Sequence, residues 1–270
     1  MIESRRPPSA ARRPTSPWAW ALLAAAVAVA AIGVYAANRE GGYRWGWYVV
    51  SPFTETGREN LSFLMGGLAV TLQISLLATL LAVVIGLLIA LPGLSADPWA
   101  RRFNRVFVET FRAVPALEML LWVHYGLPVL LGVNFDVFTS GVIGLALTEA
   151  AFMAEVFRAG IQSIERGQHE AARAMGLSRV QRLRFVVLPQ AMRRILPALG
   201  NQFVIVVKMS ALVSVIGLAD LTRRANELVT TLYRPLEVYT LLVLEYLVLV
   251  LVISWAVRRL ERRLAAGEAS

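Results

Sequence analysis

Residues 64–91 read LMGGLAVTLQISLLATLLAVVIGLLIAL and contain no charged side chain. A helix needs only about 20 apolar residues to cross roughly 30 Å of hydrocarbon, and this run exceeds that length. Pro92 and Gly93 follow it directly and mark its end. The whole chain is 57% hydrophobic with a mean hydropathy of +0.60, more than a soluble domain usually carries. The sequence therefore predicts an all-α, multi-pass transmembrane helical bundle.

Five further stretches have the length and composition of membrane spans. They are residues 18–37, about 111–131, about 138–157, about 196–218 and about 236–257. Pro115, Gly126 and Pro128 interrupt the stretch at 111–131, which predicts a kinked or partly broken helix. Six helices are expected in all: an additional N-terminal helix at 18–37 and a five-helix core within residues 62–257.

Both ends of the chain are basic. Residues 1–17 contain four arginines among four prolines, which predicts a disordered tail. Residues 258–270 have four arginines among their first six residues and predict a second basic tail. A cleaved signal peptide is the alternative interpretation of residues 1–37. The apolar stretch is longer than the usual signal core of about 7 to 15 residues, which favours a retained helix.

The net charge of +9 is distributed between the apolar spans and does not form one basic domain, so nucleic-acid binding is not expected. With the N-terminus inside, 19 of the 27 Lys and Arg residues fall in inside segments and six in outside segments. Cytoplasmic loops retain Lys and Arg, so both termini are predicted to be cytoplasmic. The chain has no cysteine, and His124 and His169 lie too far apart in the sequence to indicate a metal site.

A long polar loop, Arg158–Arg194, separates the fourth and fifth spans, and its helix-forming runs are interrupted at Gly176. This pattern predicts a helix, a turn and a second helix at the membrane surface. Small side chains at Ala171 and Ala172 would let another protein surface approach closely, and Pro189 is expected to end the second helix. The loop is therefore predicted to be a site where another protein docks. An amphipathic surface helix is the alternative, but it would not explain the spacing of Gly176 and Pro189.

The loop resembles the signature of permease subunits in bacterial ATP-binding-cassette importers. The matching positions are Glu170, Ala171, Ala172, Gly176, Val186, Leu188 and Pro189, with valine at 186 where isoleucine is usual. The flanking residues 151–161, Gly167-Gln168, Pro189-Gln190-Ala191 and Phe111-Arg112 are similar to the polar amino-acid branch, the histidine/glutamine/glutamate type. The resemblance covers about residues 62–257.

Membership of that family implies a type I importer fold in the bacterial cytoplasmic membrane, with residues 158–195 as the coupling loop. It implies a permease for polar or charged amino acids that has no enzymatic site or cofactor of its own. Two cytoplasmic ATPase subunits would bind ATP and Mg, and a second permease subunit, identical or similar, would complete the pathway. An extracytoplasmic solute-binding protein would deliver the substrate.

Several ionisable residues fall within or near the spans, where a charge costs about 2.5 to 3.5 kcal/mol at mid-membrane. Arg112 and Glu155 lie near span ends, which favours structural or gating roles. The candidate substrate path consists of polar or aromatic residues expected to face the interior: Glu118, Trp122, Glu149, Asn201, Lys208 and Ser210.

Residues 208–212 read Lys-Met-Ser-Ala-Leu where the family usually has lysine-aspartate-threonine-serine-leucine. One hypothesis is that the added acids Glu118 and Glu149 accept an amino-acid-derived or other small cationic solute. The alternative is that one of them pairs with Lys208 or Arg112 and only holds helices together.

Two other classes of function are less compatible with the sequence. A membrane-embedded enzyme would need paired carboxylates or a histidine-based set, and neither pattern is present. A stand-alone secondary transporter often shows two similar halves, which this chain lacks, and the docking loop would have no use in one.

Overall fold

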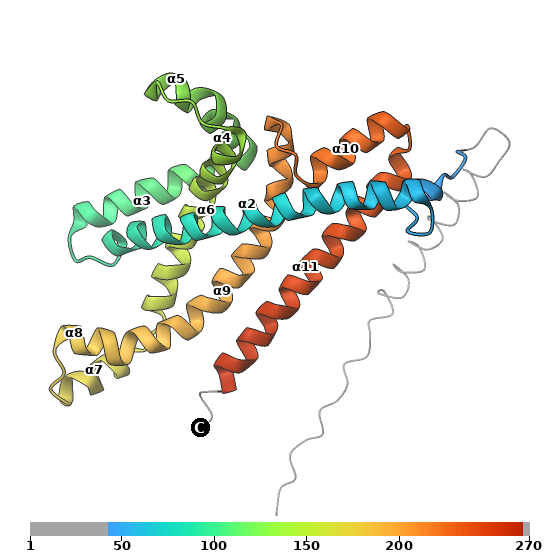
Figure 1. Ribbon diagram of the computed structural model, residues 1–270. Helices are drawn as coiled ribbons and strands as arrows, with labels where there is room; N and C mark the ends of the chain where they lie inside the picture. Colours follow the sequence, from blue (N-terminus) through green and yellow to red (C-terminus); the bar gives the residue numbers. More distant parts are fainter. Residues whose placement is uncertain (1–42, 267–270) are drawn as a thin grey trace, which may run out of the picture. The chain divides into compact units, whose positions relative to one another are not determined.

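A computed structural model describes residues 43–266, with the side chains of residues 43–263. The chain divides into two units, Met1–Gly46 and Trp47–Ser270, and the second unit carries the helices of the described part. The predicted tail at 1–17 and the predicted span at 18–37 lie outside the described residues. Within the described part the regular elements are all helices, as the sequence predicts (Figure 1).

The longer helices are α2 (Glu55–Gly93), α3 (Pro98–Ala113), α6 (Val137–Gln162), α9 (Leu188–Met209), α10 (Leu221–Leu232) and α11 (Pro235–Ala266). The shorter ones are η1 (Trp47–Val49), α4 (Ala116–Leu121), α5 (Leu127–Leu131), α7 (Arg166–Ala174), α8 (Arg179–Arg182), the π-helices η2 (Trp122–Gly126) and η3 (Leu183–Val187), and the 3-10 helix η4 (Ser210–Ile216).

Four helices of the described chain are long and apolar enough to cross a membrane, and they confirm the spans predicted near 64–91, 138–157, 196–218 and 236–257. Their bounds are Glu55–Gly93, Val137–Gln162, Arg179–Ile216 and Pro235–Arg263. A fifth span results if α3 and the helix Ala116–Leu131, which meet at a bend of 99°, are counted together. The apolar faces that remain exposed, such as that of α11, are suited to lipid.

The most extensive helix packing joins α2 to α6, which cross in Figure 1. Small residues permit this contact: a Cβ atom added to Gly86 would lie 2.5 Å from the Cβ atom of Met153 and 3.0 Å from the carbonyl oxygen of Ala150. Without a hydrophobic driving force inside lipid, close backbone approach at small residues is a main source of helix association. Ala82 and Ala90 extend the same buried face one turn in each direction.

The broken span differs from the prediction in two details. The polar segment between the second and third spans, with Arg101, Arg102 and Arg105, reads as a short loop in the sequence. It is helical, because Asp97 accepts a hydrogen bond from the Trp99 amide and Pro98 occupies the first turn. The bend predicted at Pro115 is confirmed, since Val114 adopts an extended conformation before the proline. No break occurs at Gly126 or Pro128, where a π-helical turn carries the helix onward.

Helix α10 and the C-terminal extension of α11 were not expected from the sequence. Helix α10 occupies the polar segment before the last span and is amphipathic, with Leu221, Ala225 and Leu228 buried. Helix α11 continues past the predicted span end at 257 and includes the arginines that were assigned to the basic tail.

A buried polar cluster fastens α10 to α2. The Leu221 amide donates to the Thr71 hydroxyl at 3.1 Å, and the Arg224 guanidinium donates to the Phe63 carbonyl at 2.6 Å. Asp220 caps α10 by accepting from the Arg223 amide at 2.8 Å, but its Oδ2 atom is buried without a hydrogen-bond partner. Burial raises the pKa of Asp220 to about 6, above its ordinary value of 3.8.

Replacing Gly86 with valine is expected to destabilise the protein by about 1 to 3 kcal/mol, because the added carbons collide with α6. Thermal unfolding in detergent measures the change. Ala69→Val is the control, since Ala69 is exposed on the same helix and should tolerate the substitution. Equal effects of the two variants would contradict the packing described here.

Asp220→Asn is expected to raise stability at pH 7.5 by up to about 3 kcal/mol, because asparagine keeps the cap without a buried charge. The folded-state pKa of Asp220 lies above the unfolded value, so its contribution to stability is complete below about pH 4 and is lost as the pH rises through about 6. Thermal unfolding at pH 5 and pH 7.5 should show a smaller difference in the variant.

Asp136→Asn provides the control for this pH dependence. Asp136 is an exposed cap of α6, and its hydrogen bonds with Thr139 and Phe138 lower the pKa of its carboxyl group. Its substitution should not stabilise the protein at pH 7.5. A stabilisation as large as that of Asp220→Asn would refute the burial argument.

Candidate functional site

Residues 163–187, here called the hook, connect α6 to α9 and contain α7, α8 and η3. In Figure 1 the hook projects beyond the crossing of α2 and α6, with α7 and α8 at its tip. Polar contacts tie its base together: Arg194 donates to the Ser163 carbonyl, and Gln190 donates to the side chain of Gln168 at 3.3 Å. The predicted helix, turn and second helix are present.

Gly176 forms the turn of the hook, as predicted. Its φ of +76° is in the left-handed region, which glycine adopts without the cost that a Cβ atom imposes. The Gly176 amide donates to the Arg173 carbonyl at 2.9 Å, and the Leu177 amide donates to the Ala172 carbonyl at 3.1 Å. This pair of bonds is a Schellman motif, and it ends α7. Ser178 then starts α8 through a capping box with Gln181.

The prediction that Pro189 ends the second helix is wrong. The chain stays helical from Arg179 to Ile216, so the second helix of the hook and the fifth span are one continuous element. Pro189 cannot donate a backbone hydrogen bond, and the π-helical turn η3 immediately before it accommodates that loss. The hook is therefore joined to the membrane helix without a flexible joint on that side.

The predicted loop positions divide into an outer and an inner group. Glu170, Ala171, Gly176, Leu188 and Pro189 are exposed, and Val186 is half-buried. Ala172 is completely buried within the chain, so it does not offer an outer surface as the sequence analysis expected. Since α7 packs against η3, a small side chain at 172 serves the internal packing of the hook.

Sequence reasoning missed an apolar surface on the outside of the hook. Met175, Val180, Leu183 and Phe185 are between 51% and 73% exposed, on either side of the Gly176 turn. Exposed large apolar side chains on a projecting polar loop are a recognised sign of a protein interface. The sequence feature that could have revealed these side chains is the presence of apolar residues among the arginines of residues 175–185.

The structure does not gather the six predicted path residues into one cavity. Glu118 and Trp122 are exposed on α4 and η2, whereas Glu149 is buried in α6, and its Oε2 atom has no hydrogen-bond partner. Ser210 is buried and donates to the Val207 carbonyl of its own helix. This bond uses the hydroxyl hydrogen of Ser210 within its own helix.

Asn201 and Lys208 are both exposed on α9, as their shared helical face predicts. Lys208 lines a groove of about 370 Å³ between α9 and α11, which none of the other five path residues reaches. The described side chains form ion pairs such as Arg158–Glu155 and Arg223–Glu227, but none that joins Glu118 or Glu149 to Lys208 or Arg112. The alternative pairing of Glu118 or Glu149 with Lys208 or Arg112 therefore does not occur within the described chain.

Arg112 and Glu155, predicted to have structural or gating roles, line one cavity between α3 and α6. The Arg112 guanidinium lies 5.0 Å from the ring centroid of Phe152, and Glu155 forms an ion pair with Arg158 at 2.9 Å. Among the described residues no group of three or more His, Asp or Glu side chains is arranged to hold a metal ion.

Several apolar spans and a projecting hook with exposed apolar side chains define the class as a multi-pass membrane protein. Comparison with known families specifies the class further: residues 82–266 match the family described as binding-protein-dependent transport system inner membrane component. The chain belongs to this family.

Relatives and solved structures agree with this assignment. The chain is 37% identical over 205 residues to the glutamine transport system permease protein GlnP of Escherichia coli K12, a match that covers 76% of this chain and 94% of GlnP. It is 36% identical over 211 residues to the arginine transport system permease protein ArtQ of Bacillus subtilis 168, covering 77% and 95%. A crystal structure of an amino acid ABC transporter with histidines matches with a TM-score of 0.72 and 39% identity, covering 76% of this chain and 96% of that one.

Gly176→Val is expected to speed amide hydrogen exchange at Leu177 and Gln181 about tenfold, because a β-branched residue at positive φ costs about 1 to 2 kcal/mol. Gly167→Val is the matched control: that position has equal open space around it but does not have a positive φ. Equal acceleration in both variants would contradict the role assigned to the turn.

Proposed function

We propose that this chain forms the translocation path of an ATP-driven importer for polar or charged amino acids, and that a separate cytoplasmic ATPase docks on the hook. The observation that carries the proposal is the exposed apolar surface formed by Met175, Val180, Leu183 and Phe185. A side chain such as Phe185, 63% exposed on a polar loop, gains free energy when a partner covers it.

Movement of the hook would reach the membrane helices through two connections. On one side η3 continues into α9 without a break. On the other, Ile164 at the base of the hook belongs to the same buried apolar cluster as Met153 of α6 and Ala82 of α2. Because such a core is close-packed, a displacement of the hook would be transmitted and not absorbed. ATP and Mg would be bound by the ATPase, and this chain would contribute no cofactor.

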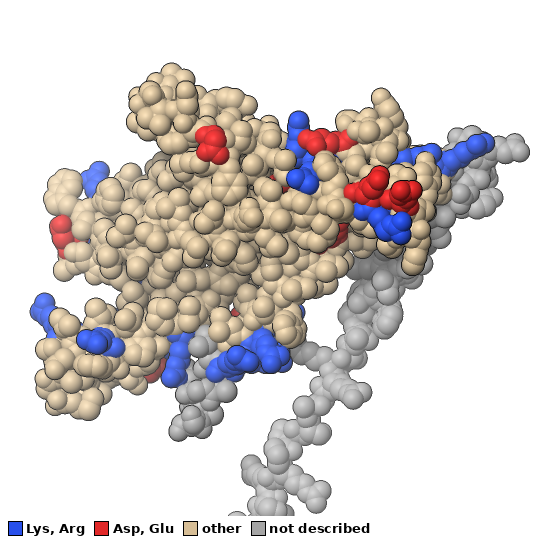
Figure 2. Space-filling view, in the orientation of Figure 1, with Lys and Arg blue, Asp and Glu red and all other residues tan. Residues whose placement is uncertain are grey.

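The basic side chains support a cytoplasmic position for the hook. Figure 2 shows Lys and Arg, with few acidic side chains, along the edge where α7, α8 and the end of α11 lie, whereas both signs mix near α10. By the rule that cytoplasmic segments retain Lys and Arg, the hook and both termini would face the cytoplasm.

The remaining partners follow from the same proposal. A second permease subunit, identical or similar, would complete the path in a bacterial cytoplasmic membrane, and an extracytoplasmic solute-binding protein would deliver the substrate. Asn201 and Lys208, exposed on α9, are the best-placed of the predicted residues to face the path.

The amino-acid substrate class is supported by the similarity to proteins named for glutamine and arginine transport. Glu118 is exposed on α4 and is available to attract a cationic solute, whereas Glu149 is 2% exposed and would require movement of α6 to reach one. Of the two acids, Glu118 is therefore the better candidate for selecting a cationic group.

The double substitution Met175→Ala and Phe185→Ala is expected to weaken binding of the cognate ATPase by at least about tenfold, since it removes two exposed anchors from the hook. Substrate-stimulated ATP hydrolysis in proteoliposomes, with the solute-binding protein present, should fall correspondingly. Binding of the ATPase to the purified permease provides a direct second measurement.

Phe53→Ala is the control for this experiment, because Phe53 is 90% exposed and precedes α2, outside the hook. It should leave ATPase binding unchanged. Unaltered binding in the double variant would refute docking on the hook. Uptake by the chain alone, driven by an ion gradient, would refute the importer and indicate a secondary transporter.

A further inference from the structure

A cavity of about 400 Å³ lies between α3 and α6, beside the end of α2. Its charged lining consists of Arg101, Arg105, Glu109 and Arg112 from α3, and Glu155 and Arg158 from α6. Four cations face two carboxylates, so the lining carries an excess of two positive charges. The cavity is on the side of the protein where α6 ends and the hook begins.

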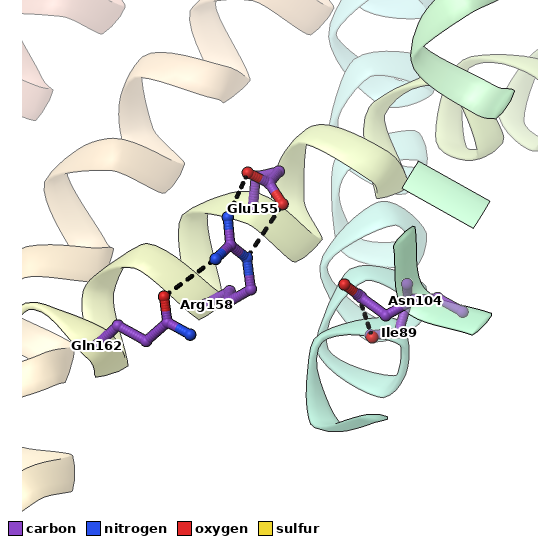
Figure 3. Close-up of polar contacts among 5 residues, drawn as sticks. All are labelled: Ile89, Asn104, Glu155, Arg158 and Gln162. Carbon is purple, nitrogen blue, oxygen red and sulfur yellow. Dashed lines mark hydrogen bonds and ion pairs between the residues drawn. The ribbon is translucent and has the colours of Figure 1, made fainter. Parts of the chain in front are cut away.

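The wall formed by α2 and α3 is rigid. Gly93 at the end of α2 has no side chain, and a Cβ atom there would lie 2.8 Å from the Cγ atom of Asn104. Asn104 in turn donates to the Ile89 carbonyl at 2.7 Å, which satisfies an acceptor in the last turn of α2 (Figure 3). This contact fixes the face of α3 that carries Arg101 and Arg105.

The opposite wall is formed by an ordered arginine. The Arg158 Nε and Nη2 atoms donate to the two oxygens of Glu155 at 3.1 and 2.9 Å, and Nη1 donates to the Gln162 side-chain oxygen at 3.0 Å (Figure 3). The negative charge of Glu155 is therefore already compensated within α6.

The arginines of α3 do not have such partners. Among the described side chains, Arg101, Arg105 and Arg112 take part in no ion pair. Arg101 and Arg105 are four residues apart and therefore share a face of the helix. Two exposed guanidinium groups on one face, both lining the same half-open cavity, suit a phosphate group, whose oxygens match the planar fork of arginine.

An apolar rim adjoins these arginines. A second hollow of about 530 Å³ shares Arg101 and Arg105 with the first and is also lined by Val106. Trp99 and Phe103, which are 75% and 56% exposed, share a face of α3 with Val106, on the side of the helix away from Arg101 and Arg105. Tryptophan is enriched at the membrane–water boundary, and exposed apolar residues beside arginines suit a ligand that has both an anionic head and an acyl chain.

We propose that the cavity between α3 and α6 binds the phosphate headgroup of an anionic membrane lipid, with its acyl chains along Val106. Basic pockets between membrane helices on the cytoplasmic side are a known means of holding such headgroups. The inference rests on the proposed function only in placing the hook, and hence this cavity, at the cytoplasmic leaflet. A free phosphate ion shares the headgroup chemistry but would leave the apolar rim uncovered.

Native mass spectrometry of the full-length chain in detergent, with added phosphatidylglycerol or phosphatidylcholine, tests the site. The wild-type protein should retain phosphatidylglycerol in preference to phosphatidylcholine. The double variant Arg101→Gln and Arg105→Gln should retain about tenfold less phosphatidylglycerol, since each arginine near the surface contributes to the attraction.

Arg258→Gln with Arg262→Gln is the matched control, because it removes two exposed arginines at the same spacing on α11, outside the cavity. Its lipid retention should stay within about twofold of wild type. An equal loss in the two double variants would overturn the proposal in favour of a general charge effect.

Gln162→Glu adds a carboxylate to the cavity while keeping the acceptor for Arg158, so it should reduce phosphatidylglycerol retention without loss of folding. Displacement of the lipid by millimolar inorganic phosphate would overturn the lipid assignment and indicate a free-anion site. No ATPase or solute-binding protein takes part, so failure here is separate from failure of the importer proposal.

Discussion

The contact between α2 and α6 supports the rest of the structure. It depends on small side chains, above all Gly86, because in lipid there is little hydrophobic gain from helix association and close backbone packing must supply the attraction. The cluster built on this contact extends from Ala82 through Met153 to Val187 at the end of η3. The membrane helices and the hook are thus packed through one shared apolar cluster.

The hook combines local determinants with tertiary ones. Its turn is set by Gly176, whose positive φ few other residues adopt easily, and by the capping box that starts at Ser178. Its rigidity comes from the unbroken passage of η3 into α9. The π-helical turn keeps this passage helical in spite of Pro189, and such turns often occur where a helix serves a function.

Predictions from the sequence succeeded where a residue restricts the backbone conformation of its immediate neighbours. Pro115 bends the chain because it forces Val114 into an extended conformation, and this constraint is local. Predictions failed at Gly126, Pro128 and Pro189, where helices continue because π-helical turns and neighbouring segments accommodate them. Burial of a side chain also depends on which helix packs against it. Ala171 and Ala172 are adjacent and equally small, yet only Ala172 packs inside the hook.

The sequence by itself determined the approximate position of four membrane helices within the described chain, and the family to which the protein belongs. Hydrophobic length and the spacing of Gly176 and Pro189 carry that information directly. Only the tertiary structure decided which polar residues meet. It separated Glu118, Glu149 and Lys208, and it placed Arg101 and Arg105 beside Arg158 around one cavity. The reason is that periodicity assigns a residue to a face of its own helix, whereas packing decides which helix that face meets.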